Sequence, residues 1–412
     1  MEGSSANNAL IESSKVRLER LGFFKEVNVE NVPVPGVNDQ IDVVYTVEEQ
    51  PSGSIGASIG YAQGYGTILG ANLSENNFLG SGKQLSVGIN RSTYQESVNL
   101  SFTEPYFTVD GVSVGYSIFA RETDYDQINV SSFSTNAKGA NVNWGYPISE
   151  VERVGFGVGF ENLDIRYGAY ASQEIRNFID TNGNKFDVFN LNLNWRKSTL
   201  NRGMFATRGT SQRLALNVAL PGSGLEYYKA TYKAQYLRGL TRSLSLKLRA
   251  DLGYGESYGD TSQLPFFKNF YGGGVGSVRG FESNSLGPQD TPCSGSAESC
   301  NNASAYNRPD PIGGNVQIEF GSEVIFPMPF VKDKRSMQSA FFIDAGNIFN
   351  TKCGDTQLNC FKPDVGELRY SVGVGVTWLS AMGPLTFSYA KPLNSSEYDE
   401  TENFQFSLGN QF

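Results

Sequence analysis

The last ten residues of the chain alternate between apolar and polar side chains. The apolar face carries Phe404, Phe406, Leu408 and Phe412, interrupted only by Asn410. A period of two is that of a β-strand with one apolar and one polar face. A soluble protein normally protects such an edge with charges or a covering segment, and this stretch has neither. The pattern therefore predicts a closed barrel in lipid, whose last strand pairs with the first and leaves no free edge.

The same alternation begins at Gly53 and continues through most of the chain. In the first segment, Ile55, Ala57, Ile59 and Tyr61 alternate with serine and glycine. About sixteen such segments follow one another, each near the length that a tilted membrane strand needs. We therefore predict an all-β fold, a 16-stranded antiparallel transmembrane β-barrel formed by residues 51–412.

Composition excludes several other classes of protein. Only 39% of the 412 residues are hydrophobic, which is too few for a bundle of membrane helices, whereas barrels hide their apolar residues by alternation. The net charge of −9 argues against a nucleic-acid partner, because phosphate binding needs clustered Lys and Arg. The chain has no His, the commonest metal ligand and general base. We expect no cofactor, no metal site and no enzymatic activity.

Residues 1–50 differ from the rest of the chain. Apolar residues recur at helical spacing before Gly22, and two short strands are expected over Glu26 to Val32 and Gln40 to Glu48. A helix with a two-stranded ribbon buries too little apolar surface for a complete domain. We interpret the segment as a small α+β module that has lost its beginning. No apolar signal segment precedes it, so a mature or truncated fragment is expected.

Loop lengths provide an independent test of the strand count. Transmembrane barrels have short turns on the periplasmic side and longer external loops. If the N-terminal module lies in the periplasm, connections from odd to even strands are the external ones. The long insertions fall at such connections, over about residues 166–184, 255–313, 351–366 and 393–401. The longest external loop is therefore expected at about 255–313.

The four cysteines form two local pairs, Cys293 with Cys300 and Cys353 with Cys360. Both pairs lie in polar loop-like stretches and have the same spacing. Two disulfide-closed loops in an oxidising compartment explain this pattern. Zinc is the alternative, but six intervening residues suit a zinc site poorly.

The longest loop contains the sequence Phe270-Tyr-Gly-Gly-Gly-Val-Gly-Ser-Val-Arg-Gly-Phe281. Its core, Val278, Arg279, Gly280 and Phe281, resembles the loop-six signature of the BamA family of outer-membrane protein assembly factors. Leu21 to Val27 is similar to the helix-to-strand junction of POTRA modules, the soluble repeats that precede the barrel in that family. The barrel matches the family further at Thr103 to Phe107, Pro221 to Ser223, Gly383 to Leu385 and Phe387 to Ala390.

The resemblance implies that Arg279 folds into the barrel and pairs with acidic residues on its wall. Glu323 and Asp344 match the family's acidic positions. If Phe320 and Ile343 face lipid, alternation turns both carboxylates into the lumen, so the pattern allows this latch. The alternative is that both are ordinary solvated lumen charges.

The resemblance also implies a function, the folding and insertion of β-barrel proteins into the bacterial outer membrane. The expected partners are unfolded β-barrel clients, lipoproteins of the assembly complex, and outer-membrane lipid including lipopolysaccharide. The N-terminal module would lie in the periplasm. The alternatives are a translocation barrel of the TamA or two-partner secretion type, and a passive porin.

The first and last strands suggest a mechanism for this function. Glycines remove packing from the first strand, and Gly409 offers a kink near the end of the last. A seam opened in hydrocarbon leaves backbone groups unpaired, which favours pairing with an incoming strand. We therefore expect a lateral gate between Gly53 to Tyr61 and Asn403 to Phe412. Its residues are Gly53, Ile55, Gly56, Ile59, Gly60, Phe404, Phe406, Leu408, Gly409 and Phe412.

Overall fold

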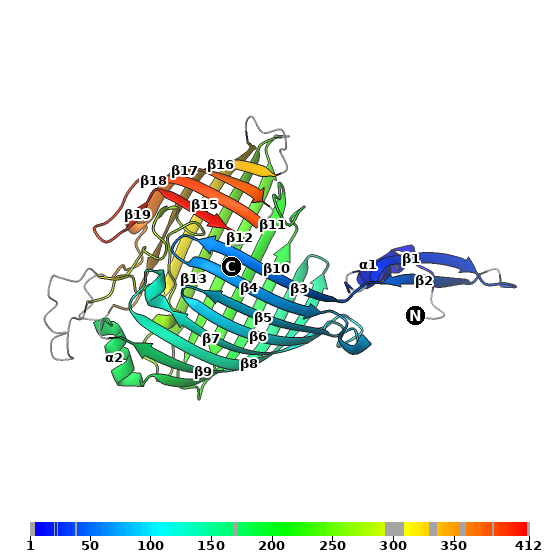
Figure 1. Ribbon diagram of the computed structural model, residues 1–412, viewed down its shortest axis with the longest axis horizontal. Coiled ribbons are helices and arrows are strands. Elements are labelled where there is room, and N and C mark those ends of the chain that lie inside the picture. Colours follow the sequence, from blue (N-terminus) through cyan, green and yellow to red (C-terminus); the bar gives the residue numbers. More distant parts are fainter. Residues whose placement is uncertain are drawn as a thin grey trace.

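A computed structural model of the chain describes residues 5–19, 21–22, 24–37, 39–168, 171–241, 243–292, 309–328, 336–353, 360–380 and 383–409. Figure 1 shows two parts, a large barrel and a small module that projects from one end of it. The chain passes from the module directly into the first barrel strand.

The N-terminal module contains the helix and the two strands that the sequence predicts. Helix α1 (Asn8–Glu19) packs on strand β1 (Phe24–Pro33), which pairs with β2 (Ile41–Glu49) in an antiparallel ribbon. Gly22 follows the helix with a φ of 78°, a left-handed conformation that glycine adopts without strain. Among the described residues of this module, Val27 is the buried one. The described part of this module therefore buries little apolar surface.

The remaining chain forms a closed antiparallel barrel of 16 strands, as the alternation predicts. Its strands are β3 (Gly53–Ala62), β4 (Gly66–Glu75), β5 (Gln84–Ser92), β6 (Gln95–Glu104), β7 (Ser113–Asp124), β8 (Phe133–Ser149), β9 (Glu152–Tyr167), β10 (Lys185–Ser198), β11 (Gly209–Ala219), β12 (Tyr227–Gly239), β13 (Ser245–Ser257), β15 (Val316–Pro327), β16 (Met337–Phe349), β17 (Arg369–Ser380), β18 (Gly383–Pro392) and β20 (Phe404–Leu408). Two further short strands, β14 (Gly280–Phe281) and β19 (Thr401–Glu402), pair with each other outside the barrel sheet.

The two faces of the barrel wall follow from the period of two. Large apolar side chains at alternate positions point outward and are exposed, as at Phe189 and Leu193 of β10 and Phe341 and Ile343 of β16. Exposed apolar residues in such a band are stable when lipid rather than water surrounds them. The intervening positions line the lumen and are mostly small or polar. Among the described residues, no helix is long and apolar enough to cross a membrane.

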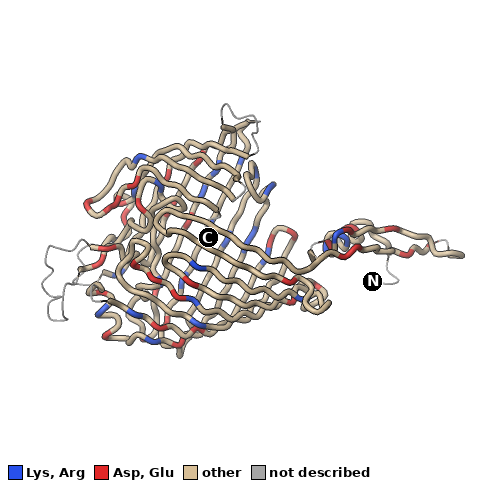
Figure 2. Tube along the Cα trace, in the orientation of Figure 1, with Lys and Arg blue, Asp and Glu red and all other residues tan. Residues whose placement is uncertain are grey.

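The connections divide the barrel into two different ends. When the barrel strands are counted from β3 as the first, short turns join even-numbered strands to odd-numbered ones at the end where the N-terminal module is attached, and the long loops lie at the opposite end (Figure 1). We call these the short-turn end and the long-loop end. Figure 2 shows Asp and Glu positions around the long loops, and Lys and Arg positions on neighbouring strands of the far wall.

An apolar cluster closes the long-loop end. The insertion after β9 contains a helix, α2 (Gln173–Asn182), whose N-cap residue Ser172 accepts a hydrogen bond from the Ile175 amide. The buried side chains of Ile175 and Phe178 face Phe266, which belongs to the connection between β13 and β15. We call that connection, residues 258–315, loop six. The same cluster also includes Phe133, Leu163, Ile165, Phe186, Phe267 and Ile312.

Candidate functional site: loop six and the barrel seam

Loop six folds back into the lumen and presents Arg279 to two carboxylates on the wall. Nε of Arg279 lies 2.7 Å from Oδ2 of Asp344, and Nη2 donates to Oδ1 of Asp344 at 3.0 Å. The same Nη2 lies 2.9 Å from Oε1 of Glu323. Asp344 is fully buried. The bidentate geometry is the strongest form of this ion pair, and it is placed where water does not compete.

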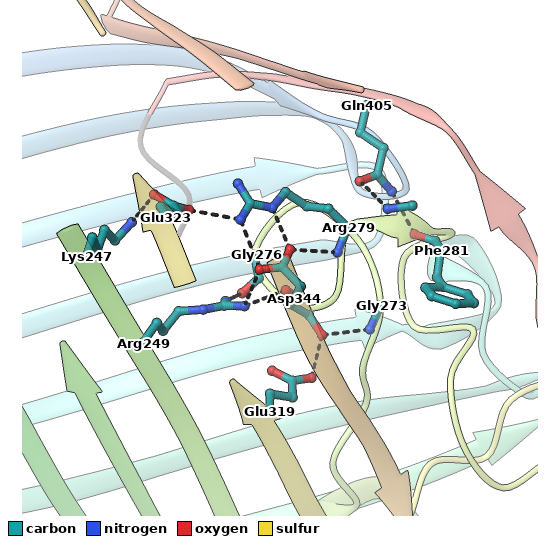
Figure 3. A network of polar contacts seen from close by, with 12 residues as sticks. Lys247, Arg249, Gly273, Gly276, Arg279, Phe281, Glu319, Glu323, Asp344 and Gln405 are labelled. Atoms are coloured by element: carbon teal, nitrogen blue, oxygen red, sulfur yellow. Dashed lines mark hydrogen bonds and ion pairs between the residues drawn. The ribbon is translucent and has the colours of Figure 1, made fainter. Parts of the chain in front are cut away.

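Further wall residues complete the charge balance around Arg279 (Figure 3). Lys247 lies 3.2 Å from the second oxygen of Glu323, and Arg249 donates to the loop carbonyls of Gly276 and Ser277. The guanidinium carbon of Arg279 also lies 3.4 Å from the ring centroid of Phe342, a cation–π contact. Loop six is therefore fixed through both its side chains and its backbone.

The residues that flank Arg279 are packed rather than exposed. Val278 and Phe281 are fully buried and form an apolar cluster with Leu286. Gly280 has a φ of 93°, and a Cβ at this position would lie 3.1 Å from the Cβ of Ala390 in β18. Only glycine allows the loop backbone to approach the wall this closely in this conformation. The structure thus brings Val278, Arg279, Gly280, Phe281, Glu323 and Asp344 into one site.

The barrel closes between β20 and β3 through a very short contact. Among the described residues, which end at Gly409, these strands share two register pairs, Ser407 with Ala62 and Leu408 with Tyr61. Neighbouring strands elsewhere pair over much longer stretches, as β3 does with β4 from Gly53↔Glu75 to Ala62↔Gly66. On the outer face of the barrel, the Tyr61 and Phe406 rings stack with their centroids 5.0 Å apart.

The remaining gate residues lie on these two strands. Ile55 and Ile59 are 88% and 53% exposed on the lipid side, and Phe404 is exposed on the same face. Gly60 faces β20, where an added Cβ would lie 3.1 Å from the carbonyl oxygen of Leu408. Gly409 has a φ of 89°, so the chain bends immediately after β20. Gly53 and Gly56 lie in the part of β3 that pairs with β4 alone, and Phe412 lies outside the described residues.

Loop six also contacts both sides of the seam. On the β20 side, Gln405 donates to the Phe281 carbonyl at 2.7 Å and accepts from the Gly280 amide at 3.3 Å. On the β3 side, Ser283 donates to the carbonyl of Gln63 at 3.1 Å. Gln63 in turn accepts from the Phe406 amide at 3.1 Å. The loop that carries Arg279 is therefore hydrogen-bonded to both edges of the closure.

One of the two predicted cysteine pairs lies within the described residues. Cys353 and Cys360 form a disulfide in the loop between β16 and β17, with Cα atoms 5.8 Å apart. Cys293 and Cys300 lie outside the described residues.

Two kinds of contact in this site were not predicted from the sequence. Phe342 alternates onto the lumen face, where an aromatic ring is out of place unless something covers it, and that is a usable signal. Gln63 lies between alanine and glycine and Gln405 lies between two phenylalanines, and nothing local indicates that loop six is the partner of either side chain. Such contacts join segments far apart in the chain and follow from the closed fold.

The Omp85 superfamily domain profile matches residues 77–412, and the POTRA profile, described as a surface antigen variable number repeat, matches residues 1–50. The outer membrane protein assembly factor BamA of Neisseria meningitidis serogroup B is 34% identical over all of this chain, which covers 54% of that protein. BamA of Nitratidesulfovibrio vulgaris is 26% identical, with 48% of that protein covered. The chain thus spans about half the length of these relatives.

Solved structures agree with this assignment. The crystal structure of BamA from Haemophilus ducreyi lacking POTRA domains 1–3 superposes with a TM-score of 0.86 and 31% identity, covering 99% of this chain and 79% of that one. CdiB from Acinetobacter baumannii has a TM-score of 0.58 and 14% identity, which shows a shared fold alone. The chain belongs to the BamA family of the Omp85 superfamily, and its 16-stranded barrel is a barrel of the bacterial outer membrane.

Proposed function

We propose that this protein folds other β-barrel proteins and inserts them into the outer membrane, using the seam between β3 and β20 as a lateral gate. The observation that carries the proposal is the two-pair closure of the barrel. Each unpaired backbone group in hydrocarbon costs several kcal/mol, so a long seam would not open. A seam of two register pairs requires few hydrogen bonds to be broken.

Opening leaves the edge of β3 without a partner over most of its length. Within the described residues, which end at Gly409, the stretch from Gly53 to Gly60 has no register partner on the β20 side even in the closed barrel. A client strand can add there by β-augmentation, with main-chain hydrogen bonds that do not depend on the client sequence. This explains how one seam could serve many different clients.

Loop six is the latch of the gate in this proposal. Arg279 holds the loop in the lumen through Asp344 and Glu323, and the loop then bonds to Gln405 and Gln63 on the two edges. The edges are thus joined through the loop as well as through their own register pairs. Release of either contact lowers the free energy needed to open the seam.

The orientation of the protein in the membrane and its partners are proposed from the family. Residues 1–50 are taken as a periplasmic module and residues 51–412 as the barrel unit, with the short-turn end facing the periplasm. Assembly-complex lipoproteins would bind on the periplasmic side, and lipopolysaccharide would surround the outer leaflet of the barrel. A passive porin would need an open lumen, whereas loop six occupies the lumen around Arg279.

A reversible cross-link across the seam tests the gate. The variant Ala62→Cys with Ser407→Cys joins directly opposite positions of β3 and β20, and Ser86→Cys with Ser101→Cys is the matched control within the wall. We expect the oxidised seam variant in proteoliposomes to insert a client barrel at least tenfold more slowly, with recovery after reduction. The control should insert at the normal rate in both states. Normal insertion by the locked seam variant would contradict the gate.

A further inference from the structure

Four cationic side chains form a row across one part of the lumen wall. Arg153 of β9, Arg196 of β10 and Arg213 of β11 are directly opposite one another in the strand register, and Lys233 of β12 is opposite Arg213. We call these four residues the basic row. Figure 2 shows Lys and Arg positions on neighbouring strands of the far wall.

The basic row faces the lumen. Phe156 of β9, Leu193 of β10 and Leu214 of β11 are exposed on the lipid side, and each cationic residue lies an odd number of positions from its strand's apolar residue. All four cationic side chains are exposed. None of them makes an ion pair or side-chain hydrogen bond with another residue in the described part of the chain. Like charges at directly opposite positions destabilise a sheet, so this arrangement needs a compensating reason.

Three other lumen cations of this barrel have carboxylate partners. Lys247 pairs with Glu323, Arg249 with Asp251, and Arg279 with Asp344. In the same register, Lys233 is opposite Asp251 of β13, and Asp251 is opposite Glu319 of β15. Those two carboxylates already accept contacts from Arg249 and from Ser277 of loop six. The acidic part of the register is therefore engaged, and the basic row is left for another partner.

A large cavity lies over the basic row at the short-turn end. It has a volume of about 960 Å³ and is lined by Arg153, Arg196 and Arg213 together with Arg17 and Leu21 of the N-terminal module. Five cations line the cavity against three carboxylates, Asp110, Glu150 and Glu152, so its lining has a net positive charge. Of the carboxylates, Glu152 is bonded to Lys197 at 3.3 Å and to the Trp195 indole at 2.7 Å. A space of this size, at the upper end of small-ligand pockets, accommodates several residues of a polypeptide.

We propose that the basic row binds acidic segments of unfolded clients as they enter the lumen from the short-turn end. The inference rests on the proposed function, because that function supplies the polypeptide. Guanidinium groups bind carboxylates in bidentate geometry, and several exposed cations together attract an acidic segment more strongly than one does. The row lies on the wall face opposite the lipid-facing residues, so charge complementarity selects an acidic polypeptide in the lumen over a lipid headgroup.

Peptide binding tests the inference directly. The probe is a fluorescent twelve-residue poly-Glu peptide, measured by anisotropy with the full chain in nanodiscs, beside poly-Lys and poly-Gln peptides. We expect salt-sensitive binding of poly-Glu alone, weakened at least tenfold in the Arg153→Gln, Arg196→Gln, Arg213→Gln variant. The control removes three exposed cations near the long-loop end, Arg91→Gln, Arg166→Gln and Lys185→Gln, and should bind within twofold of the parent chain. Both variants are checked for folding by their heat-dependent migration in gels.

Three results would overturn the inference. They are equal poly-Glu binding by the row variant and the parent chain, equal binding of poly-Lys, and displacement of the peptide when phosphatidylglycerol replaces phosphatidylcholine in the nanodisc. The last result would show that the row takes a lipid phosphate instead.

Client insertion separates this inference from the proposed function. We expect the row variant to insert a client with acidic external loops several-fold more slowly than the parent chain does. Both proteins should insert equally a client whose loop carboxylates are changed to amides. If the parent chain inserts no client at all, the proposed function fails while peptide binding remains measurable. If the row variant loses peptide binding but inserts both clients normally, the inference alone fails.

Discussion

The seam between β20 and β3 and the wall between β8 and β9 are built by the same alternation but are stabilised in different ways. Strands β8 and β9 pair from Phe133↔Tyr167 to Ser149↔Glu152, whereas β20 and β3 share two pairs. The long wall pairing is stable through its own ladder of main-chain hydrogen bonds. The seam adds side-chain hydrogen bonds from loop six to Gln63 and Gln405.

This difference indicates how a closed barrel can contain one weak joint without unfolding. The main-chain ladder of the wall does not depend on what occupies the lumen. The seam depends on loop six, and loop six depends on a buried ion pair between Arg279 and Asp344. Perturbing the loop should therefore loosen the seam and leave the wall intact.

The largest expected effect comes from the ion pair itself. The Arg279→Ala variant leaves Asp344 buried, with Arg249 4.0 Å away as its nearest remaining cation. Breaking one partner of a buried pair costs about 3–5 kcal/mol. We expect amide hydrogen exchange to rise strongly in loop six and in β20, and to stay unchanged in β8 and β9. Equal acceleration in the wall would show that the ion pair stabilises the whole barrel, and Arg279→Lys tests whether charge without the bidentate geometry suffices.

A smaller and more local effect is expected at Gln405. The Gln405→Ala variant leaves the Phe281 carbonyl and the Gly280 amide without this side-chain partner. The Phe281 carbonyl still accepts from the Gly274 amide, so the expected loss lies near the lower end of the range of about 1–3 kcal/mol for an unmet buried group. Faster exchange should be confined to β20 and the end of β3, and the Ala62→Cys, Ser407→Cys cross-link should form more slowly. Gln235→Ala, a lumen-facing change in β12, is the matched control and should leave both measurements unaltered.

Only part of the structure around the seam could be predicted from the sequence. Alternation identified the barrel, its strand number and the lumen side of Glu323 and Asp344, because a period of two is a local property. The resemblance supplied Arg279 as the partner of those carboxylates. The length of the β20–β3 pairing was not predictable, because Phe404 to Phe412 alternates like a strand to its last residue. The described strand β20 nevertheless ends at Leu408, where the chain bends at Gly409.

Helix α2 and the cysteine loops show the same limit in the long loops. The segment of about 166–184 was expected as an insertion, but its helix packs through Ile175 and Phe178 on aromatic residues of loop six. That packing joins residues almost ninety positions apart, as from Phe178 to Phe266. No local pattern contains such a contact. The disulfide of Cys353 with Cys360, by contrast, closes a short loop that the spacing predicted.

The smallest expected effect concerns a second anchor of loop six, the contact of Asp290 with Ser131 at the long-loop end. Asp290 is buried, accepts a hydrogen bond from Ser131, and accepts another from the Asp310 amide at 2.9 Å. Burial raises the pKa of Asp290 from 3.8 to about 7, opposed by the Ser131 hydrogen bond and reinforced by the nearby charges of Asp310 and Glu174. Between these two pKa values the folded anchor holds more protons than the unfolded chain, so its stability falls as pH rises from about 4 to 7 and then levels off.

Lowering the pH from about 8 to 5.5 should therefore tighten this anchor by about 1–2 kcal/mol. The measurement is amide exchange of residues 286–292, corrected for the intrinsic effect of pH on exchange. Asp290→Asn keeps the site neutral and should remove the pH dependence. Because Ser131 lies between β7 and β8, the change should not reach β20, which would separate the loop's anchor on the wall from its anchor on the seam. A pH dependence that persists in the Asn variant would show that Asp290 is not the titrating group.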